Sequence, residues 1–460
     1  MELNNPINNA QAAAIFFFLL LLLHFARSRK PQDHKNNLLS KLPSPPWKLP
    51  VMGHMHLVGS LRDLAVHHIW PRPDAPPPRR RADARRLLAE AVLRTHDLAF
   101  ASRPRSMVTD IILYGAKDSC FAPYGDHFRK VRKVVTVHLL NSKKVLAYRP
   151  ARQEEVRIVI DKLRKAAMSV VDMTEILHSF ANDLICRAVS GKFFREEGRN
   201  KMFRELIDTN ASLLGGFNLE DFFPGLARKK LINKMLCARA MRVRRRWDKL
   251  LDKLIDDHAT RLARRQDDDD DDAEHQQDSD FIDILLYHQE EYGFTRDNIK
   301  AILVDMFEAG IDTSYLVLES AMVELIRKPH LLAKLQDEVR RAMPKGQDMI
   351  TEDDLVDMAY LKAVIKETLR LHPPVPLYIP HLSREDCSID GYMIPAGTRR
   401  RMCPGIHSAT ITLEIMLANL MYCFNWKLPL GMKKEDIDMI EVFGLAVHRK
   451  EKLLLVPQVA

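Results

Sequence analysis

The feature that most constrains the fold is a helical periodicity that runs from about Leu87 to the C-terminus. Apolar residues recur three or four positions apart, and residues that commonly cap helices precede many of these segments. Strand patterns are sparse: an Asp-Gly turn joins two short apolar runs at 388–398, and KLLLVPQ at 452–458 has the composition of a strand. With 460 residues, 46% of them apolar, the chain can bury a large core. The sequence predicts one large domain over residues 51–460, mainly α with small β-sheets.

The N-terminus carries a membrane signal. An unbroken apolar run covers residues 12–23, no basic residue precedes it, and three basic residues follow it between positions 27 and 30. A cleaved signal peptide would instead carry positive charge ahead of the apolar run. Under the positive-inside rule, this distribution places everything after Lys30 in the cytosol. We therefore expect a retained signal anchor at 1–30, followed by a proline-rich hinge at 31–50.

The cysteines and the net charge limit the environment and the partners. Six cysteines lie far apart without a C-x-x-C pair, which is atypical of a disulfide scaffold and indicates a reducing compartment. The formal charge of +9 suits nucleic acid, an acidic protein or an anionic membrane. The densest basic run, at 238–247, matches no nucleic-acid-binding motif, so we expect no nucleic-acid partner.

Two segments depart from the helical pattern. Residues 68–91 are crowded with proline and arginine and cannot form a regular core strand. This stretch is either a proline-rich surface loop or the product of a shifted reading frame or a wrong splice boundary. Six consecutive aspartates at 267–272 cannot be buried and predict a flexible loop between two helices.

Residues 298–329 predict one long helix that a proline closes. Its centre is unusual, because Gly310 weakens the helix and three polar residues follow at Asp312, Thr313 and Ser314. A hydroxyl there can bond to the carbonyl one turn earlier, which would bend the helix and open a polar groove. The alternative is that these residues form an exposed face of the helix.

A second helix is expected before the proline pair at 373–374, and it carries Glu367 and Arg370 three residues apart on one side. Such a pair is usually an exposed salt bridge of little energetic weight. Apolar residues surround this pair in the sequence. A buried pair that contacts a third partner is therefore the alternative interpretation.

The sequence around Cys403 gives this cysteine a special environment. Three arginines precede it at 399–401, a Pro-Gly turn follows at 404–405, and a helical segment begins directly beyond. Nearby positive charge and a helix N-terminus both stabilise a thiolate. Cys403 could be a small core residue or a nucleophile, although no matched histidine accompanies it. As a metal ligand, a lone thiolate suits haem iron better than zinc, which needs several protein ligands.

Three motifs follow one another behind the anchor and hinge: A-G-I-D-T-S at 309–314, E-T-L-R at 367–370 and R-x-C-x-G at 401–405. With this combination the chain resembles the plant microsomal cytochromes P450, which are haem-thiolate monooxygenases. Segments such as CFAPYGDHFRKVRK and LLGGFNLEDFFPGLAR look most like the grass enzymes that hydroxylate indole and indolinone in benzoxazinoid synthesis. The resemblance implies the mainly helical cytochrome P450 fold.

The resemblance also implies roles for individual residues. Cys403 would be the axial ligand of the iron of haem b, and Asp312 with Thr313 would deliver protons during dioxygen activation. The remaining implied residues are the haem propionate partners Arg401, Arg132 and His381 and the structural pair Glu367 and Arg370.

The implied reaction inserts one atom of O2 into a small apolar substrate, aromatic and heterocyclic like indole, with electrons from NADPH. An acidic NADPH-cytochrome reductase would dock on the basic surface. The anchor would hold the chain in the endoplasmic reticulum membrane, with the catalytic domain facing the cytosol. The substrate pocket is expected from residues 106–121, 212–217, 307–313 and 375–377.

The chain also departs from the family pattern. Phe128 stands where the family usually has a tryptophan, and residues 68–91 do not resemble the helix and strands expected there. The residues that the family places before the cysteine loop are absent, which implies a deletion near 398–400. The lost segment would include the third member of the network of Glu367 and Arg370, and an incompletely paired buried charge is costly. A catalytically inactive, haem-free, membrane-anchored remnant is therefore the alternative function.

Overall fold

The computed structural model describes residues 99–191, 197–215, 230–267, 280–343, 346–376, 378–379, 382–389, 392–394, 403–442 and 444–460. The chain divides into two compact units: one combines residues 1–101 with 381–401, and the other combines 102–380 with 402–460. The predicted anchor, the hinge, the atypical segment and the deletion point lie outside the described residues. Within those residues, no helix is both long enough and apolar enough to cross a membrane.

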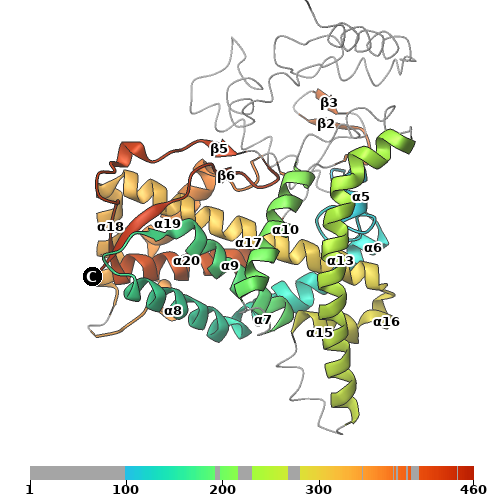
Figure 1. Ribbon diagram of the computed structural model, residues 1–460, viewed down its shortest axis with the longest axis horizontal. Helices are drawn as coiled ribbons and strands as arrows, with labels where there is room; N and C mark the ends of the chain where they lie inside the picture. The colour runs from blue at the N-terminus through green and yellow to red at the C-terminus, as the bar shows by residue number, and fades with distance from the viewer. Residues whose placement is uncertain are drawn as a thin grey trace, which may run out of the picture. The chain divides into compact units, whose positions relative to one another are not determined.

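The second unit is mainly helical, as the sequence predicts (Figure 1). Its α-helices are α5 (Met107–Ile112), α6 (Asp126–Val135), α7 (Ser142–Ala147), α8 (Arg149–Lys165), α9 (Met173–Ser190), α10 (Glu197–Leu214), α13 (Lys230–Asp267), α15 (Phe281–Tyr287), α16 (Gln289–Tyr292), α17 (Arg296–Arg327), α18 (Pro329–Arg341), α19 (Ala359–Leu371) and α20 (Ile406–Cys423). Shorter turns of helix are the π-helix η4 (Thr136–Leu140) and the 3-10 helices η5 (Asp353–Leu355) and η6 (Lys434–Asp436).

The strands are short and pair antiparallel. They are β1 (Val171–Asp172), β2 (Cys387–Ile389), β3 (Tyr392–Ile394), β4 (Phe424–Lys427), β5 (Glu441–Val442), β6 (His448–Arg449) and β7 (Leu454–Val459). One sheet has the order β1-β7-β4, whereas β2 pairs with β3 in the first unit and β5 pairs with β6. The predicted hairpin around the Asp-Gly turn and the predicted C-terminal strand are both confirmed.

Helix α17 forms the centre of the second unit. It begins at a capping box, in which the side chains of Thr295 and Asn298 each accept a hydrogen bond from the other residue's backbone N–H. It ends before Pro329, which cannot continue the helix and instead begins α18. Helix α17 packs against α9, α10, α13, α19 and α20, and Figure 1 shows α13 crossing it. The long helix predicted at 298–329 is therefore confirmed.

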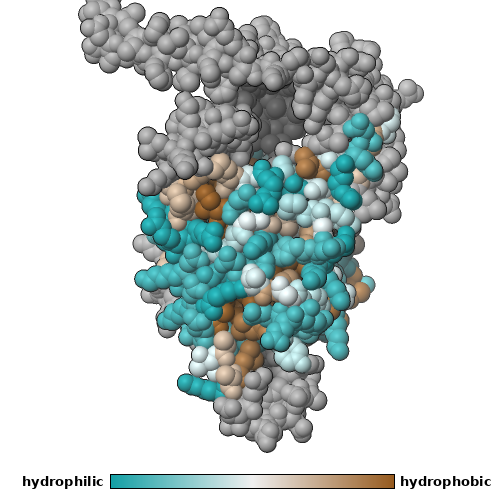
Figure 2. Space-filling view, turned by 90° about the vertical axis from the view of Figure 1, so that its right-hand side faces the viewer, coloured by the Kyte–Doolittle hydropathy of each residue, from teal (hydrophilic) through white to brown (hydrophobic). Residues whose placement is uncertain are grey.

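A cluster of buried apolar side chains holds these helices together. Three of its largest members are Phe203 on α10, Trp247 on α13 and Phe307 on α17. The rings of Phe203 and Phe307 lie 4.8 Å apart and those of Phe203 and Trp247 lie 5.5 Å apart, both edge to face. The described residues visible in Figure 2 are mostly hydrophilic, with smaller patches of apolar residues between them.

The predicted acidic loop falls between α13 and α15. Asp267 is the last residue of α13, and residues 268–279 lie outside the described residues. All six cysteines belong to the described residues and none of them forms a disulfide, in line with the sequence.

Candidate active site

Asp312 lies in the middle of α17 with its carboxyl group buried. Its Oδ1 atom has no hydrogen-bond partner among the described residues. Burial, assisted by the nearby charge of Asp208 and opposed by Arg204, raises the pKa of Asp312 to about 8. At neutral pH the Asp312 carboxyl is therefore protonated in most molecules and can act as a proton donor.

The hydroxyl groups that follow Asp312 bond backwards along the helix. Thr313 Oγ1 donates to the Ala309 carbonyl oxygen at 2.7 Å, and Ser314 Oγ donates to the Gly310 carbonyl oxygen at 2.8 Å. The hydrogen bonds predicted from the sequence are thus confirmed. Between residues 298 and 319, every residue of α17 is buried except Ala309, Gly310 and Thr313. The acid and the alcohol therefore flank the opening in an otherwise buried stretch of helix.

Gly310 has a packing role in addition to its low helix propensity. A Cβ atom at this position would lie 2.6 Å from Cδ1 of Ile185 on α9. Only glycine therefore allows α9 to approach α17 this closely without moving the Ile185 side chain.

Cys403 is exposed and free, two residues before Gly405, which is the N-cap of α20. The predicted helix beyond the Pro-Gly turn is confirmed as α20. Cys403 thus lies just before α20, a helix that packs against α17, which carries the acid–alcohol pair. The thiol is accessible to a ligand.

Of the three predicted propionate partners, one lies within the described residues. Arg132 lies in the last turn of α6 and is half-buried. On the same helix the buried ring of Phe128 packs 5.8 Å from the ring of Tyr124. Arg401 and His381 lie outside the described residues. Their predicted contacts stay predictions.

Glu367 and Arg370 form the expected pair, with Arg370 Nη2 2.6 Å from Glu367 Oε1. The alternative interpretation of a buried pair is wrong, and the usual one of an exposed salt bridge holds, because the two side chains are 54% and 66% exposed. The apolar neighbours in the sequence occupy other faces of α19, where Leu361 and Ile365 are buried. An exposed pair stays solvated without a third member, so the predicted cost of an incompletely paired buried charge does not arise here.

A group of buried carboxyls on α17 and in the loop after α5 was not predicted from the sequence. Burial and the charge of Asp305 raise the pKa of Asp118 to about 8. Asp305 Oδ2 accepts hydrogen bonds from the backbone N–H and the hydroxyl of Ser119, at 3.0 and 2.6 Å. Glu308, also buried, lies between Asp305 and Asp312 at spacings of three and four residues. The spacing of these acidic residues by three and four positions in an otherwise apolar helix is the sequence feature that could have indicated the group.

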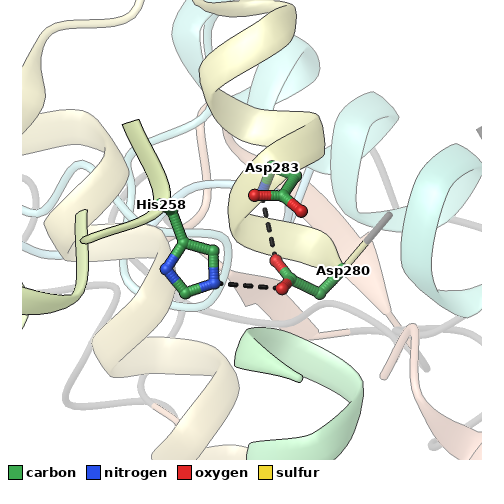
Figure 3. Close-up of side chains that lie close together, drawn as sticks. All are labelled: His258, Asp280 and Asp283. Atoms are coloured by element: carbon green, nitrogen blue, oxygen red, sulfur yellow. Dashed lines mark hydrogen bonds and ion pairs between the residues drawn. The ribbon is translucent and has the colours of Figure 1, made fainter. Parts of the chain in front are cut away.

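A second cluster consists of His258, Asp280 and Asp283, whose ligand atoms lie within 4.8 Å of one another (Figure 3). His258 Nε2 lies 3.0 Å from Asp280 Oδ2, and Asp280 Oδ1 accepts the backbone N–H of Asp283. The guanidinium of Arg261 is 2.8 Å from both carboxylates and offsets one of their two negative charges. The cluster therefore ties α13 to α15 as a hydrogen-bonded network.

The fold and site together define a class: a mainly helical enzyme whose central helix carries a buried proton donor beside an alcohol, with an accessible thiol just before a helix that packs on the central one. The cytochrome P450 family model matches residues 84–399. The matched range ends before Cys403. Since the match covers more than half of the chain, the chain belongs to the cytochrome P450 family and is a haem-dependent monooxygenase.

Curated relatives from Zea mays support this assignment. The chain is 56% identical to an indole-2-monooxygenase, over 94% of this chain and 90% of the relative. It is 43% identical to a 3-hydroxyindolin-2-one monooxygenase, over 91% and 88%, and 43% identical to an indolin-2-one monooxygenase, over 93% and 91%. The first alignment extends over 491 positions, more than the 460 residues of this chain, so part of that relative has no counterpart here.

Solved structures show the same fold. A zebra fish cytochrome P450 solved with abiraterone superimposes with a TM-score of 0.65 and 20% identity, over 81% of this chain and 91% of that chain. A structure with progesterone gives a TM-score of 0.66 and 19% identity, over 81% and 92%. The expected mainly helical cytochrome P450 fold is therefore confirmed.

The described residues fit the haem that this family carries. A thiolate ligand must be accessible, and Cys403 is both exposed and free. The cofactor also needs open surface beside the proton donor, and α17 leaves Ala309 and Thr313 uncovered next to Asp312. Cys403 lies just before α20, and α20 packs against α17.

Proposed function

We propose that the chain hydroxylates a small apolar, aromatic heterocyclic compound related to indole, with O2 and with electrons that a reductase takes from NADPH. The observation that carries the proposal is the protonated, buried Asp312 beside Thr313 at the opening of α17. The substrate class is supported by 56% identity to the maize indole-2-monooxygenase. The formal charge of +9 supports docking of an acidic reductase.

Individual residues have distinct roles in this proposal. Cys403 would hold the haem iron, and Arg401, Arg132 and His381 would bind the haem propionates. The bound haem supplies the oxidising chemistry that inserts oxygen into a C–H bond. Asp312 holds a proton on its carboxyl group, and the Thr313 hydroxyl, which donates to the Ala309 carbonyl oxygen, is positioned to pass a proton at the opening of the helix.

The first test is the absorption spectrum of the full chain, expressed with haem supplied, reduced and exposed to carbon monoxide. We expect the red-shifted band of thiolate-bound haem, and we expect Cys403→Ser to lose it. The matched control is Cys387→Ser, which changes another free cysteine and should keep the band. A folded chain without the band would instead support the alternative of a haem-free remnant with a deletion near 398–400.

The acid–alcohol pair is tested by coupling. Thr313→Ala should lower the yield of hydroxylated product per NADPH consumed, because proton transfer through the hydroxyl is lost. Ser314→Ala is the matched control, since its hydroxyl makes the same kind of backward hydrogen bond one residue further along. Equal product yields in wild type and Thr313→Ala would rule out the proposed proton transfer.

We also propose that residues 1–30 anchor the chain in the endoplasmic reticulum membrane, with the catalytic domain in the cytosol. The support is the apolar run at 12–23 and the basic residues directly after it. Cell fractionation of the full chain and of a chain that lacks residues 1–30 tests this. Equal membrane recovery of the two would contradict the anchor.

A further inference from the structure

Two histidine rings lie side by side in a part of the chain that the proposed function does not use. His138 lies in the π-helix η4, and His288 is the C-cap residue of α15. Their ring centres are 4.7 Å apart, and the ring planes are tilted by 41°. Both residues are half-buried, and the side chain of His288 is 25% exposed. The two imidazoles are therefore close together and within reach of solvent.

The spacing of the two rings suits a shared metal ion. Bonds from zinc to imidazole nitrogen are about 2.0–2.1 Å long, so two rings that share one ion at roughly 90–110° have their centres about 5 Å apart. The observed distance of 4.7 Å is close to this value. The tilt of 41° matches neither the parallel offset nor the edge-to-face arrangement that ring pairs prefer by themselves.

Glu291 fixes the tautomer of His288, because its Oε2 atom lies 2.7 Å from His288 Nδ1. A carboxylate only accepts hydrogen bonds, so Nδ1 carries a proton and Nε2 of the neutral ring keeps its lone pair for a ligand. A carboxylate that holds the second nitrogen is the usual partner of a metal-binding histidine. The rings of Tyr287 and Tyr292 pack edge to face on His288 at 5.0 and 5.9 Å and restrict its rotation.

The surroundings of His138 favour its neutral, metal-binding form. Burial, the charge of His288 and that of Lys144 lower the pKa of His138 below its usual value, although Glu291 opposes this. The ring is therefore mostly neutral at neutral pH, and one of its nitrogens carries a lone pair. Lys133 and Lys144 repel a cation at this position, whereas Glu291 attracts it. The π-helical turn that carries His138 is a rare element that often occurs at functional sites.

We propose that His138 and His288 bind one divalent transition-metal ion of the Ni²⁺ or Zn²⁺ type, each through one imidazole nitrogen, with water completing the coordination. Imidazole suits these ions, whereas Mg²⁺ and Ca²⁺ prefer oxygen ligands. The ion cross-links η4 and α15, which are distant in the sequence, so it stabilises the folded chain.

The direct test is isothermal titration calorimetry of nickel chloride into the full-length chain, expressed with haem supplied and purified without a histidine tag. Ni²⁺ is the probe because zinc also binds thiolates, and Cys403 is exposed. We expect one Ni²⁺ ion per chain in the tightest binding step, and EDTA should remove it. A chain that does not bind Ni²⁺ overturns the proposal.

Variants assign the tightest step to the two rings. His138→Ala and His288→Ala should each weaken it about tenfold or more, because the second imidazole binds the ion intramolecularly. Glu291→Gln should weaken it about tenfold, since the carboxylate no longer holds His288 Nδ1. The matched control is His330→Ala, which removes an exposed histidine from α18 and should keep the affinity. Unchanged affinity in both variants of the pair overturns the proposal.

Thermal unfolding distinguishes the loss of a ligand from the loss of the fold. Nickel chloride should raise the Tm of the wild type and of His330→Ala, and it should leave the Tm of His138→Ala and of His288→Ala unchanged. Each chain is compared with itself without metal, so a lower starting Tm in a variant does not affect the result. An equal rise in all four chains would place the Ni²⁺ ion elsewhere and overturn the proposal.

Discussion

Replacing Asp312 by asparagine should make the protein more stable while it removes the proton donor. Burial raises the pKa of this carboxyl from 3.8 to about 8 in the folded chain. Between these two values the unfolded chain releases a proton that the folded chain keeps, so folding is penalised more as the pH rises. Each pH unit in this window lowers the free energy of unfolding by about 1.4 kcal/mol, and the total loss is roughly 4 kcal/mol at pH 7. Asparagine never ionises and does not incur this penalty.

The stability gain is therefore expected to depend on pH. Urea denaturation of the wild type and of Asp312→Asn at pH 5 and pH 7 should show a gain that is larger by roughly 3 kcal/mol at pH 7. The control is Asp337→Asn, which changes an exposed aspartate in the middle of α18 and should alter the free energy of unfolding little at either pH. A gain of the same size at both pH values, or a loss at pH 7, would show that the Asp312 carboxyl is not held protonated by burial.

Two further predictions concern buried charges that support the fold. Arg152 lies on α8 and contacts Glu352 through two hydrogen bonds of 2.7 and 3.0 Å, with the side chains 2% and 5% exposed. Arg152→Met should lower the free energy of unfolding by about 3–5 kcal/mol, and the double variant with Glu352→Met should recover most of it; denaturation of the three chains checks this. Burial lowers the pKa of His258, but the hydrogen bond and charge of Asp280 outweigh burial and raise it overall. The stabilisation by protonated His258 is therefore complete below its unfolded pKa of about 6.5 and is lost as the pH rises through the folded pKa. His258→Gln should be destabilised more at pH 5.5 than at pH 8.5 in thermal unfolding, and equal losses would contradict this.

The local elements of the fold were predictable because their signals lie within a few residues of one another. Pro329 separates α17 from α18, and in the sequence an Asp-Gly pair separates β2 from β3. Thr313 and its carbonyl acceptor at Ala309 are one turn apart, so their hydrogen bond was predictable as well. Each of these features depends on the covalent chain and on sterics, which the sequence specifies directly.

Burial was not predictable in the same way. Glu367 and Asp312 both lie in helices among apolar residues, yet the structure exposes the first and buries the second. The difference depends on which face of each helix the neighbouring helices cover, and those neighbours are distant in the sequence. The sequence therefore supplied the residues of a proton donor and a salt bridge without distinguishing their environments.

The sequence by itself determined the helical class, the order of the three motifs and the local hydrogen bonds of α17. Only the tertiary structure decided that Asp312 keeps its proton, that Glu367 and Arg370 stay solvated, and that Asn210 reaches Glu308 across 98 positions of the chain. The physical reason is that a carboxyl's pKa and the satisfaction of a buried oxygen depend on solvent exclusion by packed helices. Packing between distant segments is a property of the folded chain as a whole.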